Sequence, residues 1–124
     1  MGLDQYAYKV ANVKSLTDLT FPAGAMVDWD FDYWRKFYGL QNWMEDLYHE
    51  KGGREEFNCM PVRLTLQDLD RLERDMQKDD FYEDRIWDTL EEEKKHTVEH
   101  LEEFIKNARE ALAEGYAVYY DSWW

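Results

Sequence analysis

The sequence predicts a single α+β domain over residues 1–124, in which a small antiparallel or mixed three-stranded sheet packs against about three helices. Segments rich in Tyr, Val and other strand-forming residues lie near the start, the middle and the end of the chain, and helical apolar spacing lies between them. A length of 124 residues is typical of one domain. Aromatic residues make up 17% of the chain, which is enough apolar surface for a core and excludes an acidic disordered tail.

The first strand is predicted over residues 3–10, where aromatic residues and Val alternate with polar ones. Residues 12–25 contain Pro22 and Gly24 and are predicted to form a loop. Acids and aromatics then alternate from Asp28 onward. This pattern fits either an extended entry into a helix or the first turn of that helix, and the sequence does not separate the two.

Residues 39–51 are predicted to form a helix that ends at the Gly52–Gly53 pair; its apolar face consists of Trp43, Met44, Leu47 and Tyr48. A second strand is predicted over residues 58–64, with Pro61 placing it near an edge or a bulge. Within that strand, Cys59 is expected to be a small buried thiol rather than a nucleophile.

Thr65 followed by Asp68 predicts a helix N-cap with an acid in the first turn. The apolar face of that helix would consist of Leu66, Leu69, Leu72 and Met76. The longest helix is predicted near residues 86–114 and ends before Gly115. Its apolar stripe would be Leu90, Val98, Leu101, Ile105, Ala108 and Leu112, and residues 116–120 would form the last strand.

The chain is strongly acidic, with 15 Lys and Arg against 28 Asp and Glu and a net charge of −13. This charge disfavours direct binding to nucleic acid, because phosphates are neutralised by clustered Lys and Arg. No apolar run is long enough to span a bilayer, and residues 1–6 lack the features of a signal peptide. We therefore expect no membrane association and a cytoplasmic location, which fits the single cysteine.

His96, Glu99 and His100 match the H-x-x-E-H pattern of a group of zinc peptidases. Two imidazoles one helical turn apart can share a zinc ion, and the glutamate can activate the bound water. A metal-dependent hydrolase is therefore an alternative function. The third ligand of such sites comes from a later helix, and only 24 residues follow His100. We favour a solvated acidic helix face that contains two histidines, and we expect no metal and no cofactor.

Asp28, Asp30 and Asp32 resemble the start of a calcium-binding loop, but the positions that require Gly and Glu hold Tyr33 and Gly39. We therefore expect three acids on one face of an extended segment. Trp29, Phe31 and Tyr33 would then lie on the other face.

Residues 79–103 contain 11 acids and three bases. Acids along one exposed helix can imitate a row of phosphates and occupy the basic groove of a DNA-binding protein, which makes DNA mimicry a second alternative. An ordinary soluble helix with pairs such as Glu91–Lys95 explains the same pattern. The predicted acidic face consists of Asp79, Asp80, Glu83, Asp84, Asp88, Glu91, Glu92 and Glu93.

The aromatic residues exceed what so small a core readily buries, and Trp, Tyr and Arg dominate interface hot spots. An exposed aromatic patch indicates a protein partner or self-association. The same residues could instead form the core, with their polar groups bonded at its margin. The predicted partner-binding residues are Trp29, Tyr33, Trp34, Arg35, Lys36, Trp43, Trp123 and Trp124.

Several aromatic motifs occur in a fixed order along the chain: residues 2–6 (GLDQY), 33–36 (YWRK), 40–44 (LQNWM), 57–62 (FNCMPV) and 119–124 (YYDSWW). In this order they resemble a family of small uncharacterised bacteriophage and prophage proteins. Residues 79–83 depart from the Gly-Phe-Phe-Phe-Gly segment that members of this family often have.

Some relatives carry a phosphoglycerate kinase label, which does not fit this chain, because such a kinase needs two domains and a nucleotide site. The resemblance implies a phage accessory protein in the host-cell cytoplasm. Together with the aromatic and acidic excess, it leads us to expect a non-enzymatic protein. Such a protein would bind a host protein of a defence or metabolic system and inhibit or redirect it.

Overall fold

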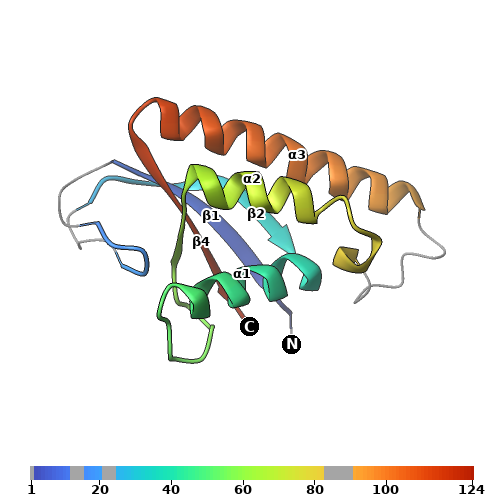
Figure 1. Cartoon of the computed structure of the whole chain (residues 1–124), viewed down its shortest axis with the longest axis horizontal. Coiled ribbons are helices and arrows are strands. Elements are labelled where there is room, and N and C mark those ends of the chain that lie inside the picture. Colours follow the sequence, from blue (N-terminus) through green and yellow to red (C-terminus); the bar gives the residue numbers. More distant parts are fainter. Residues whose placement is uncertain (1, 12–15, 21–24, 83–90) are drawn as a thin grey trace.

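The computed structural model describes residues 2–11, 16–20, 25–82 and 91–124, which form an antiparallel sheet and helices that cover one side of it (Figure 1). The predicted α+β class is confirmed. The sheet has four strands rather than three, in the order β2-β1-β4-β3. Its strands are β1 (Asp4–Ala11), β2 (Val27–Arg35), β3 (Val62–Leu64) and β4 (Tyr116–Trp123). The helices are α1 (Tyr38–Glu50), α2 (Leu66–Asp75), the 3-10 helix η1 (Asp79–Tyr82) and α3 (Glu91–Ala113).

The main core lies between the sheet and the helices, because α1, α2 and α3 all lie on the same side of the strands (Figure 1). Alternate residues of β1 and β4 point into this core, as the two-residue period of a strand requires. The buried residues from both layers include Ala7, Val118 and Tyr120 from the sheet and Leu40, Met44, Leu69, Leu72, Leu101, Phe104 and Ile105 from the helices. The opposite face of the sheet carries no helix from the described part of the chain.

The additional strand is β2, the acid-rich segment that the sequence left undecided. Its pairing with β1 is irregular, because Ala7 pairs with Asp32 whereas Lys9 pairs with Asp28. Three residues of β2 thus lie opposite Tyr8 alone. Such a bulge interrupts the alternation of faces.

The expected separation of acids and aromatics onto two faces is therefore wrong. Phe31 and Asp32 both contact α3: the Phe31 ring lies 6.2 Å from that of Phe104, and Asp32 bonds His100. Trp29 and Tyr33 instead pack on rings of β1.

The predicted helix over residues 39–51 is confirmed as α1, and Gly52 follows it with a φ of +100°. Close packing explains why position 39 is a glycine, which the sequence pattern did not indicate. A Cβ atom on Gly39 would lie 1.8 Å from the carbonyl oxygen of Phe81, so the first turn of α1 approaches η1 directly.

The strand predicted over residues 58–64 is confirmed only for Val62–Leu64, and the expectation of a buried thiol is wrong. Cys59 is exposed and has a φ of 61°. Its amide donates to the carbonyl oxygen of Ser122 at 2.7 Å. The chain therefore turns sharply at Cys59, and the ladder with β4 begins after Pro61, which has no amide proton to donate.

The predicted N-cap of α2 is confirmed as a full capping box, in which Thr65 and Asp68 bond each other's backbone amides. Leu69, Leu72 and Met76 are buried as expected. Leu66 does not belong to that face, because it is the first residue of the helix and is 55% exposed.

Asp68 also receives a hydrogen bond from Lys51 Nζ at 2.6 Å. Burial alone would raise the pKa of the Asp68 carboxyl. The bonds from Lys51 and Thr65 outweigh burial, and the pKa is lowered overall. A carboxyl whose pKa is lower in the folded state stabilises the fold above its unfolded pKa, and this contribution is lost as the pH falls through the folded pKa.

We therefore expect the midpoint of urea unfolding to fall when the pH is lowered from neutral to below the ordinary Asp value of 3.8. The Lys51→Met variant should lose less stability over the same range, because it has already lost the bond that lowers the Asp68 pKa. Unfolding followed by circular dichroism at several pH values measures the difference. An identical pH dependence in the two proteins would contradict this account of Asp68.

The longest predicted helix is confirmed over Glu91–Ala113, whereas its predicted start and Leu90 lie outside the described residues. Leu101, Ile105 and Ala108 are buried as expected, and Phe104 joins them although the sequence pattern omitted it. Gly115 ends the helix with a φ of +93°. The last strand extends to Trp123, beyond its predicted end. No helix in the described ranges is long and apolar enough to cross a membrane.

Candidate interaction surface

Among the described residues, a segment after β1 covers one end of the sheet face that lies opposite the helices. Tyr8, Val10, Ala117 and Tyr119 form a second buried apolar cluster on this face, against which Tyr6, Leu16, Ala25 and Val27 pack. The Tyr119 hydroxyl fixes the covering segment by donating to the carbonyl oxygens of Thr17 and Thr20. At the other end of this face Trp29, Tyr33 and Trp123 are exposed, whereas Tyr8 is buried.

Aromatic rings from three strands gather at the uncovered end, which we call the open aromatic face and define as Tyr6, Tyr8, Trp29, Tyr33 and Trp123. The Tyr6 and Tyr33 rings lie 5.3 Å apart, and the Tyr8 and Trp29 rings lie 4.7 Å apart at 70°. Every second residue of a strand points to the same side, so Trp123 lies on the same side of β4 as Tyr119 and therefore on this face. Trp29, Tyr33 and Trp123 are 55%, 45% and 63% exposed.

A groove of about 610 Å³ lies on this face, lined by Tyr6, Tyr8, Trp29, Asp30, Phe31, Asp32 and Tyr33. Cross-strand ring pairs of this kind contribute up to about 1 kcal/mol each to the sheet and hold the rings in place. The walls of the groove are therefore formed before any partner arrives.

Two tyrosines of the groove donate hydrogen bonds to carboxylates. Tyr33 Oη donates to Asp4 Oδ1 at 2.6 Å, and this bond raises the pKa of Tyr33. Tyr8 Oη donates to Asp121 Oδ2 at 3.1 Å. Burial, and then the charge of Asp121, raise the pKa of Tyr8 above its usual value. Both phenols therefore stay protonated at neutral pH and keep their donor roles.

The pKa of Asp121 is also raised, because burial outweighs the bonds that it accepts from the Ser122 amide and from Tyr8. Asp121 lies directly opposite Tyr6 in the ladder between β1 and β4. A half-buried carboxyl thus lies beside Tyr6 and Tyr8, two of the residues that line the groove.

The structure divides the predicted partner-binding residues. Trp29, Tyr33 and Trp123 lie on the open aromatic face, and Arg35 and Lys36 are exposed at the end of β2. Sequence reasoning missed Tyr6 and Tyr8, although their spacing of two residues in a predicted strand places them on one face.

The prediction that Trp34 belongs to a partner-binding surface is wrong. Trp34 is 4% exposed and lies beneath α3, with its ring 4.9 Å from that of Phe104. It follows Tyr33 directly in a strand, so its side chain points to the opposite side of the sheet.

The other two tryptophans of the predicted partner-binding set, Trp43 and Trp124, lie away from the open aromatic face. Trp43 is half-buried, and its Nε1 donates to Asp75 Oδ2 at 2.9 Å. Trp124 is 41% exposed and donates from Nε1 to the carbonyl oxygen of Phe57. It lines a separate depression of about 340 Å³ beside Leu3 and Tyr38.

The two histidines of the H-x-x-E-H pattern have different surroundings. His100 Nε2 bonds Asp32 Oδ1 at 2.6 Å, and its ring stacks on Trp34 at 5.2 Å. His96 is exposed, with Nδ1 4.0 Å from Glu99 Oε2. Across residues 2–11, 16–20, 25–82 and 91–124, no group of three or more His, Cys, Asp or Glu is arranged to hold a metal ion.

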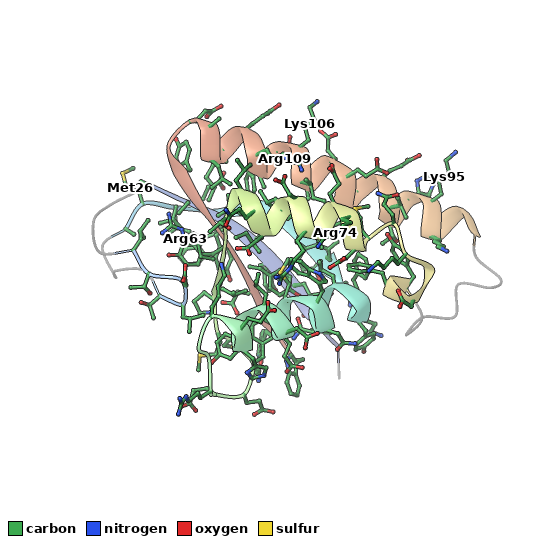
Figure 2. The ribbon with its side chains drawn as sticks, viewed as in Figure 1. Met26, Arg63, Arg74, Lys95, Lys106 and Arg109 are labelled. Atoms are coloured by element: carbon green, nitrogen blue, oxygen red, sulfur yellow. The ribbon has the colours of Figure 1, made fainter. Side chains whose placement is uncertain are left out.

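The predicted acidic face does not lie on one helix. Asp79 and Asp80 belong to η1, whereas Glu83, Asp84 and Asp88 lie outside the described residues. Glu91–Glu93 begin α3. Figure 2 shows Lys95 and Lys106 extending outward from α3, and Arg109 of the same helix pairs with Asp70 and Glu73 of α2. The described surface of α3 therefore carries charges of both signs.

Comparisons with protein-family models, with curated proteins and with solved structures found no match.

Proposed function

We propose that this chain is a non-enzymatic phage accessory protein of the host-cell cytoplasm. It binds a host protein of a defence or metabolic system through the open aromatic face and inhibits or redirects that protein. The observation that carries the proposal is an uncovered sheet face on which Trp29, Tyr33 and Trp123 are all about half exposed or more.

The composition of this face supports binding to a protein. Trp and Tyr are the residue types most enriched in interface hot spots, and contiguous exposed aromatic surface is uncommon on monomeric proteins. The rings stand on paired strands and pack against each other, so little conformational entropy would be lost when a partner binds.

Affinity capture from host lysate tests the proposal, at about 100 mM and about 500 mM salt. We expect the wild-type chain to retain one protein at both salt concentrations, because burial of aromatic surface is not screened by ions. The Trp29→Ala/Trp123→Ala variant should lose that protein. Leu66→Ala, which removes an exposed apolar side chain from α2, is the matched control and should retain it.

Unchanged capture by the Trp29→Ala/Trp123→Ala variant would overturn the proposal. Capture of nucleic-acid-binding proteins at the lower salt only, with loss on replacement of Glu91, Glu92 and Glu93 by Gln, would favour DNA mimicry instead.

A further inference from the structure

The groove of the open aromatic face combines electron-rich rings with carboxylates. Asp30 and Asp32 line it together with the aromatic rings, and the Asp32 carboxylate is already bonded to His100 of α3. Asp4 and Asp121 accept hydrogen bonds from the hydroxyl groups of Tyr33 and Tyr8 at its margins. Lys9 lies over Tyr116 and over Phe31, which itself lines the groove, and Arg35 is the cation that acts on Tyr33.

We propose that this groove receives the guanidinium group of an arginine side chain on an exposed segment of the partner protein. The inference rests on the proposed function and deepens it by giving the chemistry of the partner. The faces of Trp and Tyr rings attract cations, and the attraction strengthens where water is displaced. A phenol that donates to a carboxylate is polarised toward a more electron-rich ring, which increases this attraction.

A purely apolar occupant fits this groove poorly. It would remove water from the Asp30 carboxylate and from the carboxylates bonded to Tyr8 and Tyr33 without replacing the lost hydrogen bonds, which is costly. A cationic occupant would pair with these groups. The net charge of −13 would also attract a basic segment before contact.

Arginine fits the groove better than lysine does. The guanidinium group is planar, so it can stack on one ring while its N–H groups bond a neighbouring carboxylate. The chain contains its own example of such a contact, because the Arg71 guanidinium lies 5.5 Å from the centre of the Trp43 ring and also bonds Glu50.

Isothermal titration calorimetry tests the inference, with a short peptide of alternating arginine and glycine as the probe. A peptide in which citrulline replaces arginine has nearly the same shape without the charge. We expect the wild-type chain and Leu66→Ala to bind the arginine peptide at least about fivefold more tightly than the citrulline peptide. Trp29→Ala should lose most of this preference, and Asp30→Asn should weaken both the affinity and its dependence on salt. Circular dichroism verifies that every variant is folded.

Equal binding of the arginine peptide by Trp29→Ala and wild type would overturn the inference, because the attraction would then come from overall charge. Equal binding of the citrulline peptide would overturn it as well. Absence of arginine-peptide binding, with lysate capture that still depends on Trp29 and Trp123, would refute the inference and leave the proposed function standing. Failure of both experiments would refute both.

A second copy of this chain is the other candidate occupant, and sedimentation velocity separates it from a partner. We expect a monomer at all concentrations. A dimer that forms with increasing concentration and is abolished by Trp29→Ala would overturn the inference.

Discussion

Replacing Gln5 by leucine is expected to lower the free energy of unfolding by about 3–5 kcal/mol, because several buried bonds are lost together. Gln5 is fully buried. Its Nε2 donates to the Phe37 carbonyl oxygen at 3.0 Å and to Tyr120 Oη at 2.7 Å, and its Oε1 accepts from the Phe37 amide at 2.8 Å. Leucine would remove the acceptor of the Phe37 amide and a donor to the Phe37 carbonyl oxygen, which keeps its bond from the Gln41 amide at 3.1 Å. Each buried bond lost in this way costs about 1–3 kcal/mol.

Tyr120→Phe is the matched control for this network. The Tyr120 hydroxyl donates to Gln41 Oε1 at 2.6 Å and accepts from Gln5. Its removal leaves both bonds to Phe37 intact, so we expect a smaller loss of about 1–2 kcal/mol. Urea unfolding followed by circular dichroism measures both variants. A loss in Gln5→Leu no larger than that in Tyr120→Phe would show that the two bonds from Gln5 to Phe37 do not stabilise the fold.

Nothing in the sequence distinguishes Gln5 from a solvent-exposed polar residue of a strand. Its partners are 32 and 115 residues away, and only the assembled sheet and α1 bring them together. The signals that sequence reasoning did use correctly were local ones. Thr65 and Asp68 predicted their capping box because both partners of that motif lie within one helical turn.

The bulge in β2 explains most of what the sequence left unresolved about the candidate surface. Regular alternation would place Phe31 on the same face as Trp29 and Tyr33, but the bulge interrupts the alternation there and Phe31 packs toward Phe104 of α3. Which of the two faces the helices cover is a tertiary property, so the sequence could not separate core tryptophans from exposed ones. Cys59 was misplaced for a related reason, because its positive φ arises from the turn that brings its amide to Ser122.

Replacing Trp34 by alanine is expected to lower the free energy of unfolding by about 3–5 kcal/mol, the usual cost of truncating a buried aromatic residue. The Trp34 ring packs 4.9 Å from Phe104 and 5.2 Å from His100, and alanine would leave a cavity between the sheet and α3. Trp34→Phe should cost much less. The Trp34 Nε1 is buried without a hydrogen-bond partner in the described part of the chain, so phenylalanine removes volume and no hydrogen bond.

Trp29→Ala is the matched comparison in the same strand, because Trp29 is 55% exposed and its removal opens no cavity in the main core. We expect it to change the free energy of unfolding by less than about 1 kcal/mol while it abolishes capture of the partner. Unfolding in urea and lysate capture, measured on both variants, separate the two roles. A Trp34→Ala protein as stable as wild type, or a Trp29→Ala protein that unfolds as readily as Trp34→Ala, would contradict this assignment. Loss of capture in Trp34→Ala alone says nothing about the interface, because an unfolded chain presents no surface, and Trp29 is therefore the residue on which the binding proposal depends.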